Sequence, residues 1–275
     1  MNCCVRTALF TLLALGLVAP APADNLQPQR LAIIIDDLGY QPALDRAVLE
    51  LDPRVAVAVI PDGPGAGQIA VRAARQGREI LIHLPLAHVG SDDCETAACP
   101  HRQWSAERMR EHLEWAASRV PGAVGLSNHQ GSRFTADAAA TRRLVEGLVL
   151  LNRHRQPPLF VIDSRTTPAS LLAHEAAQAG LASAQRRVFL DHERSAEAIA
   201  AAWALLMEHA LADGRAIAIG HPYPETLAFL ARAIPALDQS RVRLVPLSSL
   251  LERPGPASLM PGQADALSGY PPASE

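Results

Sequence analysis

The stretch IIIDDLGY, residues 33–40, decides how the rest of the sequence is interpreted. Three isoleucines, typical of a buried β-strand, run directly into two adjacent aspartates, Asp36 and Asp37. Burying an unpaired carboxylate is costly, and two neighbouring carboxylates also repel each other. Such a pair therefore indicates a partner for negative charge, namely a metal ion, a proton to be accepted or an arginine. The alternative is a solvated turn in which Asp36 caps the next helix.

The composition favours one large globular domain and excludes some kinds of chemistry. Of the 275 residues, 49% are hydrophobic, which is enough for a substantial core. The formal net charge of -3 argues against a nucleic-acid-binding surface. All 25 basic residues are arginine, and the lack of lysine excludes Schiff-base and lysine-nucleophile mechanisms.

The two ends of the chain differ from its middle. Residues 1–23 combine a basic Arg6, a short apolar run and an A-x-A-like site at residues 21–23, which predicts a cleaved signal peptide and a periplasmic or secreted protein. An uncleaved membrane anchor is the alternative. Residues 252–275 are rich in proline, glycine, alanine and serine, which predicts a disordered tail. Residues 24–251 then form a single domain.

Loss of the signal peptide would leave Cys94 and Cys99 as the remaining cysteines. Because exported proteins keep disulfides, we expect these two to pair with each other. The loop they close is short, so the bond would restrain a local segment rather than the whole fold. Zinc binding by the two thiolates is the alternative, although no further cysteine would complete such a site.

Apolar, β-rich runs alternate with amphipathic stretches along the predicted domain. The expected strands are 31–35, 55–60, 79–83, 123–127, 159–162, 187–190, 216–220 and 242–246. The expected helices are 41–50, 66–77, 105–119, 135–152, 167–179, 195–213 and 224–236. Ser105, Thr135 and Ser195 favour helix starts, and Gly180 and Gly214 favour helix ends. This order predicts a parallel α/β fold, either a barrel or an open sheet.

Polar side chains follow nearly every predicted strand. In a parallel barrel all strands end on one rim, which is where active sites lie. Any single one of these residues could form a turn or a cap, so the whole set is the signal. The set comprises Asp36, Asp37, Asp62, His83, Asn128, His129, Asp163, Arg165, Asp191, His192 and His221.

The residue types in this set suit metal-assisted hydrolysis. One aspartate and two histidines form a usual catalytic zinc shell, which leaves one position open for water. The metal lowers the pKa of that water and polarises a carbonyl group. A carboxylate beside the metal can accept a proton, and a histidine across the pocket can donate one.

Several motifs, in order, resemble those of polysaccharide deacetylases with the NodB homology fold. IIIDDLGY resembles the first motif of these enzymes, T-F-D-D-G, and GREILIHLPLAH at 77–88 resembles the second, G-x-E-I-x-x-H-x-x-x-H. Other stretches resemble more closely the divergent polysaccharide deacetylase family of exported bacterial proteins. They are HLPL at 83–86, GLSNHQGSRFT at 125–135, FVIDSRTTPAS at 160–170, VFLD at 188–191 and AIGHPYPETL at 218–227.

This resemblance, which spans about residues 30 to 250, implies a distorted parallel (β/α)7 barrel of the NodB type. It also implies metal-dependent removal of N- or O-acetyl groups from a cell-envelope glycan, such as peptidoglycan or an exopolysaccharide. The motif positions assign Asp36 as general base, Asp37 and His83 as metal ligands, and His221 as catalytic acid. The expected cofactor is a divalent metal, with zinc favoured, and the expected protein is a monomer.

The sequence departs from the family pattern at the second metal-binding histidine. That residue should lie four positions after His83, but Ala87 occupies the position and His88 comes one residue late. His129, which follows another strand, is favoured over His88 as the remaining ligand. The missing histidine keeps a second function open, namely an inactive barrel that binds glycan or a regulator of cell-wall hydrolases.

Five further polar residues are expected to bind substrate or to support the metal ligands. Asp163 either orients a ligand or caps the helix that follows it. Arg133 and Arg165 either pair with the catalytic carboxylate or an anionic substrate, or form structural ion pairs. Asn128 and Asp191 are expected to line the same rim.

Overall fold

The computed structural model describes residues 27–91, 96 and 98–252. The predicted signal peptide, Cys94 and the predicted tail beyond Glu252 lie outside these residues. The strands are β1 (Gln29–Leu38), β2 (Ala56–Val59), β3 (Ile80–Leu86), β4 (Gly125–Gln130), β5 (Phe160–Asp163), β6 (Ser183–Gln185), β7 (Val188–Phe189), β8 (Arg215–Gly220) and β9 (Val242–Leu244). The helices are α1 (Pro42–Val48), α2 (Ala66–Arg75), α3 (Ala106–Arg119), α4 (Ala138–Asn152), α5 (Leu172–Gln178), α6 (Ala196–Asp213), α7 (Pro224–Ala233) and the 3-10 helix η1 (Leu247–Leu250).

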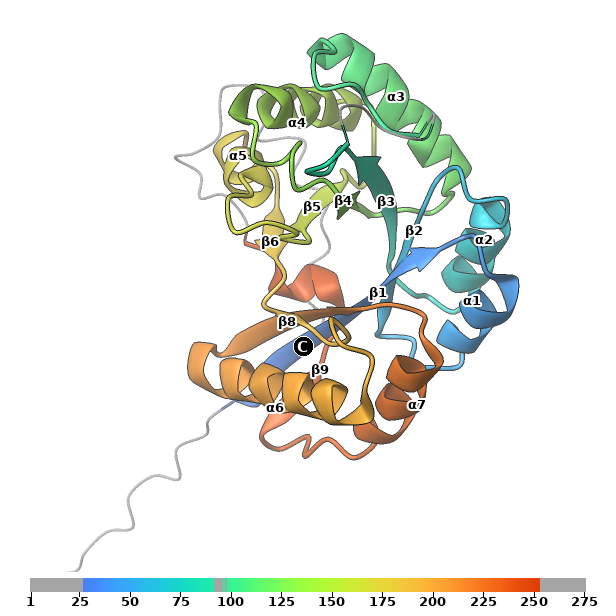
Figure 1. Cartoon of the computed structure of the whole chain (residues 1–275), viewed down its shortest axis with the longest axis vertical. Helices are drawn as coiled ribbons and strands as arrows, with labels where there is room; N and C mark the ends of the chain where they lie inside the picture. The colour runs from blue at the N-terminus through green and yellow to red at the C-terminus, as the bar shows by residue number, and fades with distance from the viewer. Residues whose placement is uncertain (1–26, 92–95, 97, 253–275) are drawn as a thin grey trace, which may run out of the picture.

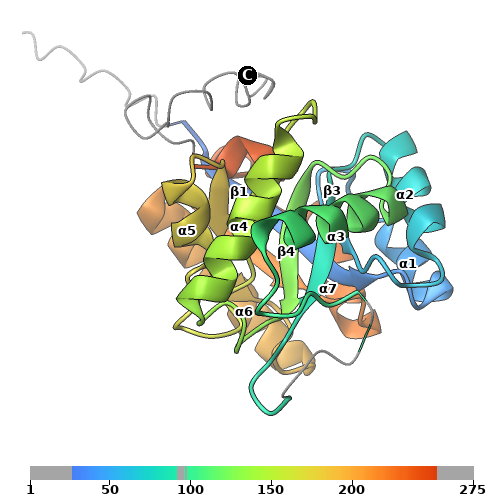
Figure 2. The same ribbon diagram turned by 90° about the horizontal axis from the view of Figure 1, so that it is seen from above.

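The strands form one parallel sheet, in the order β6-β5-β4-β3-β2-β1-β8-β7, and β9 pairs with the start of β1. Figure 1 shows the helices arranged around the outside of the strands, with α1 and α2 on one side, α3 and α4 above, and α6 and α7 below. The view from above in Figure 2 shows α3 and α4 lying across β3 and β4. The alternation of strand and helix that the sequence predicts is therefore confirmed.

The two edge strands of the sheet, β6 and β7, are consecutive in the chain. Arg186 and Arg187 connect them: the backbone N–H of Arg186 donates to Asp163 O of β5, and that of Arg187 donates to Ile217 O of β8. We count β6 and β7 as one strand, because β6 pairs with β5 and the directly following β7 pairs with β8. The sheet is thus a distorted parallel (β/α)7 barrel, as predicted.

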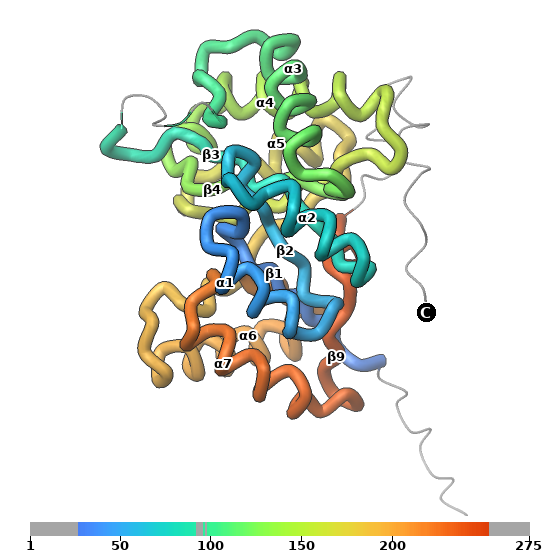
Figure 3. The backbone as a smooth tube through the Cα atoms, turned by 90° about the vertical axis from the view of Figure 1, so that its right-hand side faces the viewer, coloured from blue at the N-terminus to red at the C-terminus, as the bar shows by residue number. Residues whose placement is uncertain are grey.

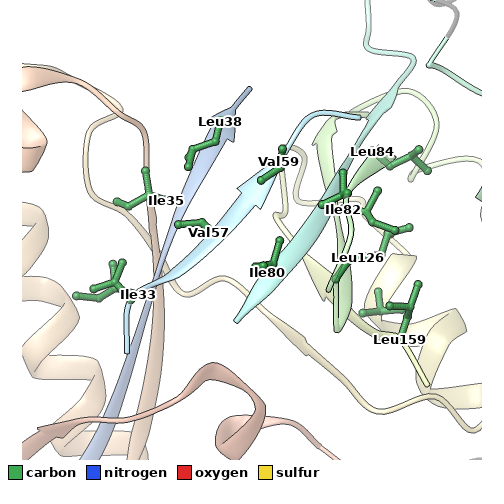
Figure 4. Close-up of a cluster of buried hydrophobic side chains, with 14 of the residues drawn as sticks. Ile33, Ile35, Leu38, Val57, Val59, Ile80, Ile82, Leu84, Leu126 and Leu159 are labelled. Atoms are coloured by element: carbon green, nitrogen blue, oxygen red, sulfur yellow. The ribbon is translucent and has the colours of Figure 1, made fainter. Parts of the chain in front are cut away.

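Two apolar clusters show which way each strand residue points. The outer cluster lies between strands and helices and includes Ile33, Ile35 and Val57, and Figure 4 shows this layer. The inner cluster fills the barrel with the alternate residues, such as Ala32 and Ile34. Its other members include Leu247, Leu250 and Leu251, so η1 closes the end of the barrel that lies opposite the carboxyl ends of the strands. Strands buried on both faces explain why the sequence runs are apolar throughout.

Most helix boundaries follow the expected capping residues. The Ser105 side chain accepts from Arg108 N, the Ser195 side chain accepts from Ala198 N, and Gly214 ends α6 in the left-handed region at φ 78°. The start of α4 was predicted wrongly. Its cap is Asp137, which accepts from the N–H groups of two alanines at 3.0 Å, because the Thr135 hydroxyl instead donates back to Gly131 O.

The C-terminal limit of the fold also differs from the prediction. Glu252, which the sequence assigned to the tail, forms an isolated antiparallel bridge with Ser183 of β6. Figure 3 shows the red end of the tube passing close to the first blue residues of the chain, where β9 pairs with β1. Within the residues that the structure describes, no helix combines the length and the apolar character needed to cross a membrane.

Gly147 allows α3 and α4 to approach closely, and this gives a prediction for stability. A Cβ at Gly147 would lie 2.6 Å from Met109 Cβ and 2.8 Å from Ala106 O. We expect Gly147→Ala to lower the free energy of unfolding by about 1–2 kcal/mol, because overpacking outweighs the helix-propensity gain. Gly67→Ala in α2, where the nearest heavy atom is 3.8 Å away, should leave stability unchanged or raise it. Urea denaturation measures both, and equal effects would contradict the packing argument.

Candidate metal centre and active site

A β-bulge brings the two adjacent aspartates to the same pocket. In a regular strand Asp36 and Asp37 would point to opposite faces. Here Ile35 pairs with Val57 and Leu38 pairs with Val59, so that three steps on β1 match two on β2. Asp37 takes the left-handed conformation at φ 63°, which aspartate tolerates better than most residues. The bulge therefore explains why an apolar strand ends on two neighbouring carboxylates.

Asp37, His83 and His129 form the group that could hold a metal ion. One ligand atom from each of the three residues lies within 4.8 Å of the others. Asp37 Oδ1 is 2.8 Å from His129 Nδ1 and 3.1 Å from His83 Nε2. The two histidine rings meet edge to face at 5.1 Å. These are the three residues assigned to the metal from the sequence. Asp37 and His129 lie near the ends of β1 and β4, whereas His83 lies in the middle of β3, which continues to Leu86 instead of ending at His83 as predicted.

The polar environment holds the Asp37 carboxylate in its charged form. Burial raises the pKa of Asp37, but hydrogen bonds from His129 and His83 and the charges of both rings outweigh burial and keep the pKa well below its usual range. On the other side of the His83 ring, Nδ1 is hydrogen-bonded to Ser127 Oγ at 2.8 Å. This contact leaves Nε2 of His83 facing the two aspartates.

Asp36 lies beside this group but is far more buried. Its side chain is 2% exposed, Oδ2 is 3.5 Å from His83 Nε2, and Oδ1 has no hydrogen-bond partner among the described residues. Burial raises the pKa of Asp36, and the charges of His83 and His221 only partly oppose this. An unsatisfied buried carboxylate oxygen is costly, and its position beside the His83 ring makes Asp36 a candidate functional group.

His221 approaches the aspartates from the end of β8 and is held by a buried carboxylate. Its Nδ1 is 2.8 Å from Asp191 Oδ1, and its backbone N–H donates to Asp191 Oδ2. Thr226 Oγ1 also donates to Asp191 Oδ2 at 2.8 Å. The Nε2 atom of His221 then lies 3.9 Å from Asp37 Oδ2. Burial lowers the pKa of His221, but the hydrogen bond and charge of Asp191 and the charges of the aspartate pair raise it overall.

A cavity of about 360 Å³ opens next to the metal group. Its wall includes Asp37 and His129, together with Tyr40 and Asp62, whose hydroxyl and carboxylate are hydrogen-bonded at 2.9 Å. Cys99, which is disulfide-bonded, also lies on this wall. The partner of Cys99 is outside the described residues, so the predicted pairing with Cys94 stays a prediction.

His88 and Ala87 line the same cavity without joining the metal group. His88 Nδ1 is 2.8 Å from the carbonyl oxygen of the adjacent Val89. Arg133, in the facing loop, donates from Nη1 to Ser91 O at 2.7 Å. Residues 87–91 thus form a loop over the cavity, and the histidine that completes the metal group is supplied by β4.

Asp163, Asn128 and Arg165 lie at the ends of β4 and β5. Asp163 Oδ2 accepts from Ser170 Oγ and Ala173 N at the start of α5, which is the capping role weighed above. Asn128 joins the two strands by accepting from Ser164 N. Arg165 adopts the left-handed region at φ 46°, with its N–H bound by Asp163 Oδ1. These contacts fix the loops that follow β4 and β5.

Two residues that support the site were not singled out from the sequence. Ser127 orients His83, and Thr226 helps to hold Asp191. Ser127 lies two residues before His129 on β4, so strand alternation places both on the inner face. That alternation was the available signal for Ser127, whereas Thr226 lies within the helix after His221 and carries no comparable pattern.

Comparison with known proteins shows the family of this chain. The family model described as "Divergent polysaccharide deacetylase" matches residues 33–251. The chain belongs to the divergent polysaccharide deacetylase family. This confirms the family assignment made from the motifs. The uncharacterized protein YibQ of Escherichia coli K12 is 33% identical over 249 residues, which cover 90% of this chain and 74% of YibQ. An uncharacterized protein of Haemophilus influenzae is 31% identical over 250 residues, covering 91% of this chain and 86% of that protein.

Solved structures support the fold of this member of the family. A crystal structure of an uncharacterized protein from Agrobacterium tumefaciens C58 superposes with a TM-score of 0.75 at 21% identity, covering 83% of this chain and 92% of that one. A putative cellobiose-phosphate cleavage protein of Enterococcus faecalis V583 superposes with a TM-score of 0.55 at 14% identity, covering 82% of this chain and all of that one. At these identities the likeness shows the shared barrel alone.

Proposed function

We propose that this member of the divergent polysaccharide deacetylase family is a metal-dependent hydrolase that removes N- or O-acetyl groups from a cell-envelope glycan. The observation that carries the proposal is the convergence, on one rim, of the Asp37–His83–His129 group with Asp36 and His221. Structural ion pairs do not require a bulged strand, a strained aspartate and an unsatisfied buried carboxylate together. The adjacent cavity provides room for a sugar residue at the same rim.

The donor set fits a divalent metal ion, and zinc is the metal we propose. One carboxylate oxygen and two imidazole nitrogens are the ligands of many catalytic zinc sites. The Asp37 carboxylate is held charged, and Ser127 fixes the orientation of the His83 ring, as a preformed site requires. When bound, the metal would polarise the acyl carbonyl and lower the pKa of the attacking water.

Asp36 is the proposed general base. Its buried carboxylate lies next to the metal ligands, and burial raises its pKa, which increases its affinity for a proton. The unsatisfied Oδ1 atom is free to accept the proton of the attacking water. Asp36 would then hold that proton while the acetyl carbon is attacked.

His221 is the proposed general acid. Asp191 fixes Nδ1, so Nε2 is the nitrogen that faces the metal group and can protonate the leaving nitrogen or oxygen of the sugar. The raised pKa of His221 favours the protonated form that this role requires. The two proton transfers thus fall to two different residues, Asp36 beside His83 and His221 beside Asp37.

Release of acetate tests the proposed function directly. We expect the zinc-loaded protein to release acetate from acetylated chito-oligomers or peptidoglycan fragments. Removal of the metal with a chelator should abolish the release, and zinc added back should restore it. A protein that binds close to one equivalent of zinc and binds these glycans, yet releases no acetate, would contradict catalysis and favour a glycan-binding or regulatory barrel.

A cell-envelope substrate requires export, which we propose on the basis of residues 1–23. Mass spectrometry of the protein from the envelope fraction of its host should find an N-terminus near Asp24. An intact Met1 in the membrane pellet would show that the segment is an uncleaved anchor instead.

A further inference from the structure

Two aromatic rings, each in contact with an arginine, flank His221. Phe189 of β7 stacks on the His221 ring with centroids 5.7 Å apart and an interplanar angle of 23°. Tyr223 lies 5.4 Å from the same ring at 31°. The guanidinium carbon of Arg186 is 3.6 Å from the Phe189 centroid, and that of Arg194 is 3.6 Å from the Tyr223 centroid.

The rings are themselves fixed by the barrel. Phe189 is in register with Ile219 of β8, two residues before His221, and it packs against the inner apolar cluster. The N–H of Tyr223 donates to the carbonyl oxygen of His221 at 2.7 Å. Arg186 is anchored where β6 passes into β7, since its Nε donates to Ser164 O and its Nη2 donates to Arg165 O.

Stacking and hydrogen bonding restrain different motions of the imidazole. A half-turn of the ring about the Cβ–Cγ bond exchanges Nδ1 with Cδ2 and Nε2 with Cε1 but keeps the ring plane, so stacking alone does not prevent it. The Asp191 hydrogen bond prevents that half-turn. A quarter-turn drives the ring edge into a neighbouring aromatic face, and this is the motion that near-parallel rings oppose. Together the two restraints leave Nε2 directed at the metal group.

We propose that Phe189 and Tyr223, supported by Arg186 and Arg194, are positioning residues that hold the imidazole of His221 in its productive orientation. This inference rests on the proposed function of His221 as general acid. The arginines support the two rings because a guanidinium is attracted to an aromatic face. Arg186 also links Phe189 to the loop after β5, so this wall of the site spans the junction between β6 and β7.

Turnover by matched variants of the zinc-loaded protein tests the proposal. We expect Phe189→Leu and Tyr223→Leu to lower kcat by about 10- to 100-fold with little change in KM or zinc content. A misoriented His221 transfers its proton less efficiently, whereas the binding of substrate is unaffected. Tyr223→Phe keeps the ring and should retain kcat within about twofold. Phe229 of α7 is a half-buried phenylalanine that packs on Trp203 of α6. Phe229→Leu is therefore the matched control and should also retain kcat.

Three kinetic outcomes would overturn the proposal. A raised KM with unchanged kcat would make the rings substrate-binding residues. Loss of activity in Tyr223→Phe equal to that in Tyr223→Leu would assign the effect to the hydroxyl group. A kcat that does not change in Phe189→Leu would show that the ring has no positioning role.

NMR of the His221 ring separates this proposal from the proposed function. In zinc-loaded protein with labelled histidine, stacked rings should shift the Cε1 proton of His221 upfield, and Phe189→Leu should reduce that shift while Phe229→Leu leaves it unchanged. If the wild type releases no acetate but this shift responds as expected, only the proposed catalytic function fails. If the shift does not respond to Phe189→Leu, the positioning role fails whatever the activity.

Discussion

Asp36→Asn is expected to lower kcat by about 100- to 10,000-fold, the usual contribution of general acid–base catalysis, while zinc content stays near that of the wild type. Asparagine keeps the shape of the buried side chain and loses the ability to accept a proton. Because Asp36 is 2% exposed and its Oδ1 lacks a partner among the described residues, removing its charge should not lower the thermal stability of the metal-free protein. Acetate release, metal analysis and calorimetry measure the three quantities.

Asp45→Asn is the matched control for that substitution. Asp45 is also 2% exposed and also has an unsatisfied Oδ1 atom, but its Oδ2 accepts from Gly39 N in the turn after β1. An asparagine oxygen can keep this hydrogen bond, so kcat should stay within about twofold of the wild type. Equal losses in the two variants would indicate a general effect of removing buried charge. A large loss of zinc in Asp36→Asn would make Asp36 a metal ligand.

His129→Ala is expected to reduce zinc affinity by at least about 100-fold, since changes to residues that only support metal ligands already cost about 10- to 100-fold. His129 Nδ1 is 2.8 Å from Asp37 Oδ1, and its loss leaves one imidazole and one carboxylate. Metal content after dialysis against limiting zinc, measured by mass spectrometry, gives the result. Activity should fall in the same variant.

His88→Ala is the control, because His88 lines the cavity next to His129 and its ring is hydrogen-bonded to the carbonyl oxygen of Val89. Its zinc affinity should stay within about twofold of the wild type. If His88→Ala loses zinc and His129→Ala keeps it, the loop over the cavity supplies the ligand and the assignment from β4 is wrong. Loss in both variants would mean that the loop moves onto the metal.

The sequence predicts that Asp37, His83 and His129 lie close together because the polar residues that follow parallel strands gather on one rim, and the family motifs assign Asp37 and His83 to a metal. Each of these residues lies in or directly after a predicted strand, and strand pairing brings the three positions together without knowledge of any loop. The barrel could be predicted for the same reason, since continuous apolar strands alternating with amphipathic helices permit few other folds. Family motifs then separated a barrel from an open sheet.

Other features depend on tertiary contacts that leave no local pattern. The left-handed conformation of Asp37 arises from a bulge against β2, which only the register with Val57 and Val59 reveals. The short strand β6, sequence SAQ, is too polar and too brief to be recognised from sequence. Glu252, which pairs with it, was therefore assigned to the tail. Phe189 and Tyr223 are far apart in sequence and gain a shared role only when β7 pairs with β8.

The central position of β1 has a consequence for how the molecule folds. The second half of this strand pairs with β2, which follows it closely in the chain. Its other edge pairs with β8, which begins only at Arg215, and its first residues pair with β9. Until nearly the whole chain has been synthesised, the isoleucine-rich strand keeps an open edge, which can template aggregation. Contacts between such distant segments also slow folding. The strand that carries both aspartates is therefore the one whose environment is completed last, and C-terminal truncation before β8 should yield insoluble protein.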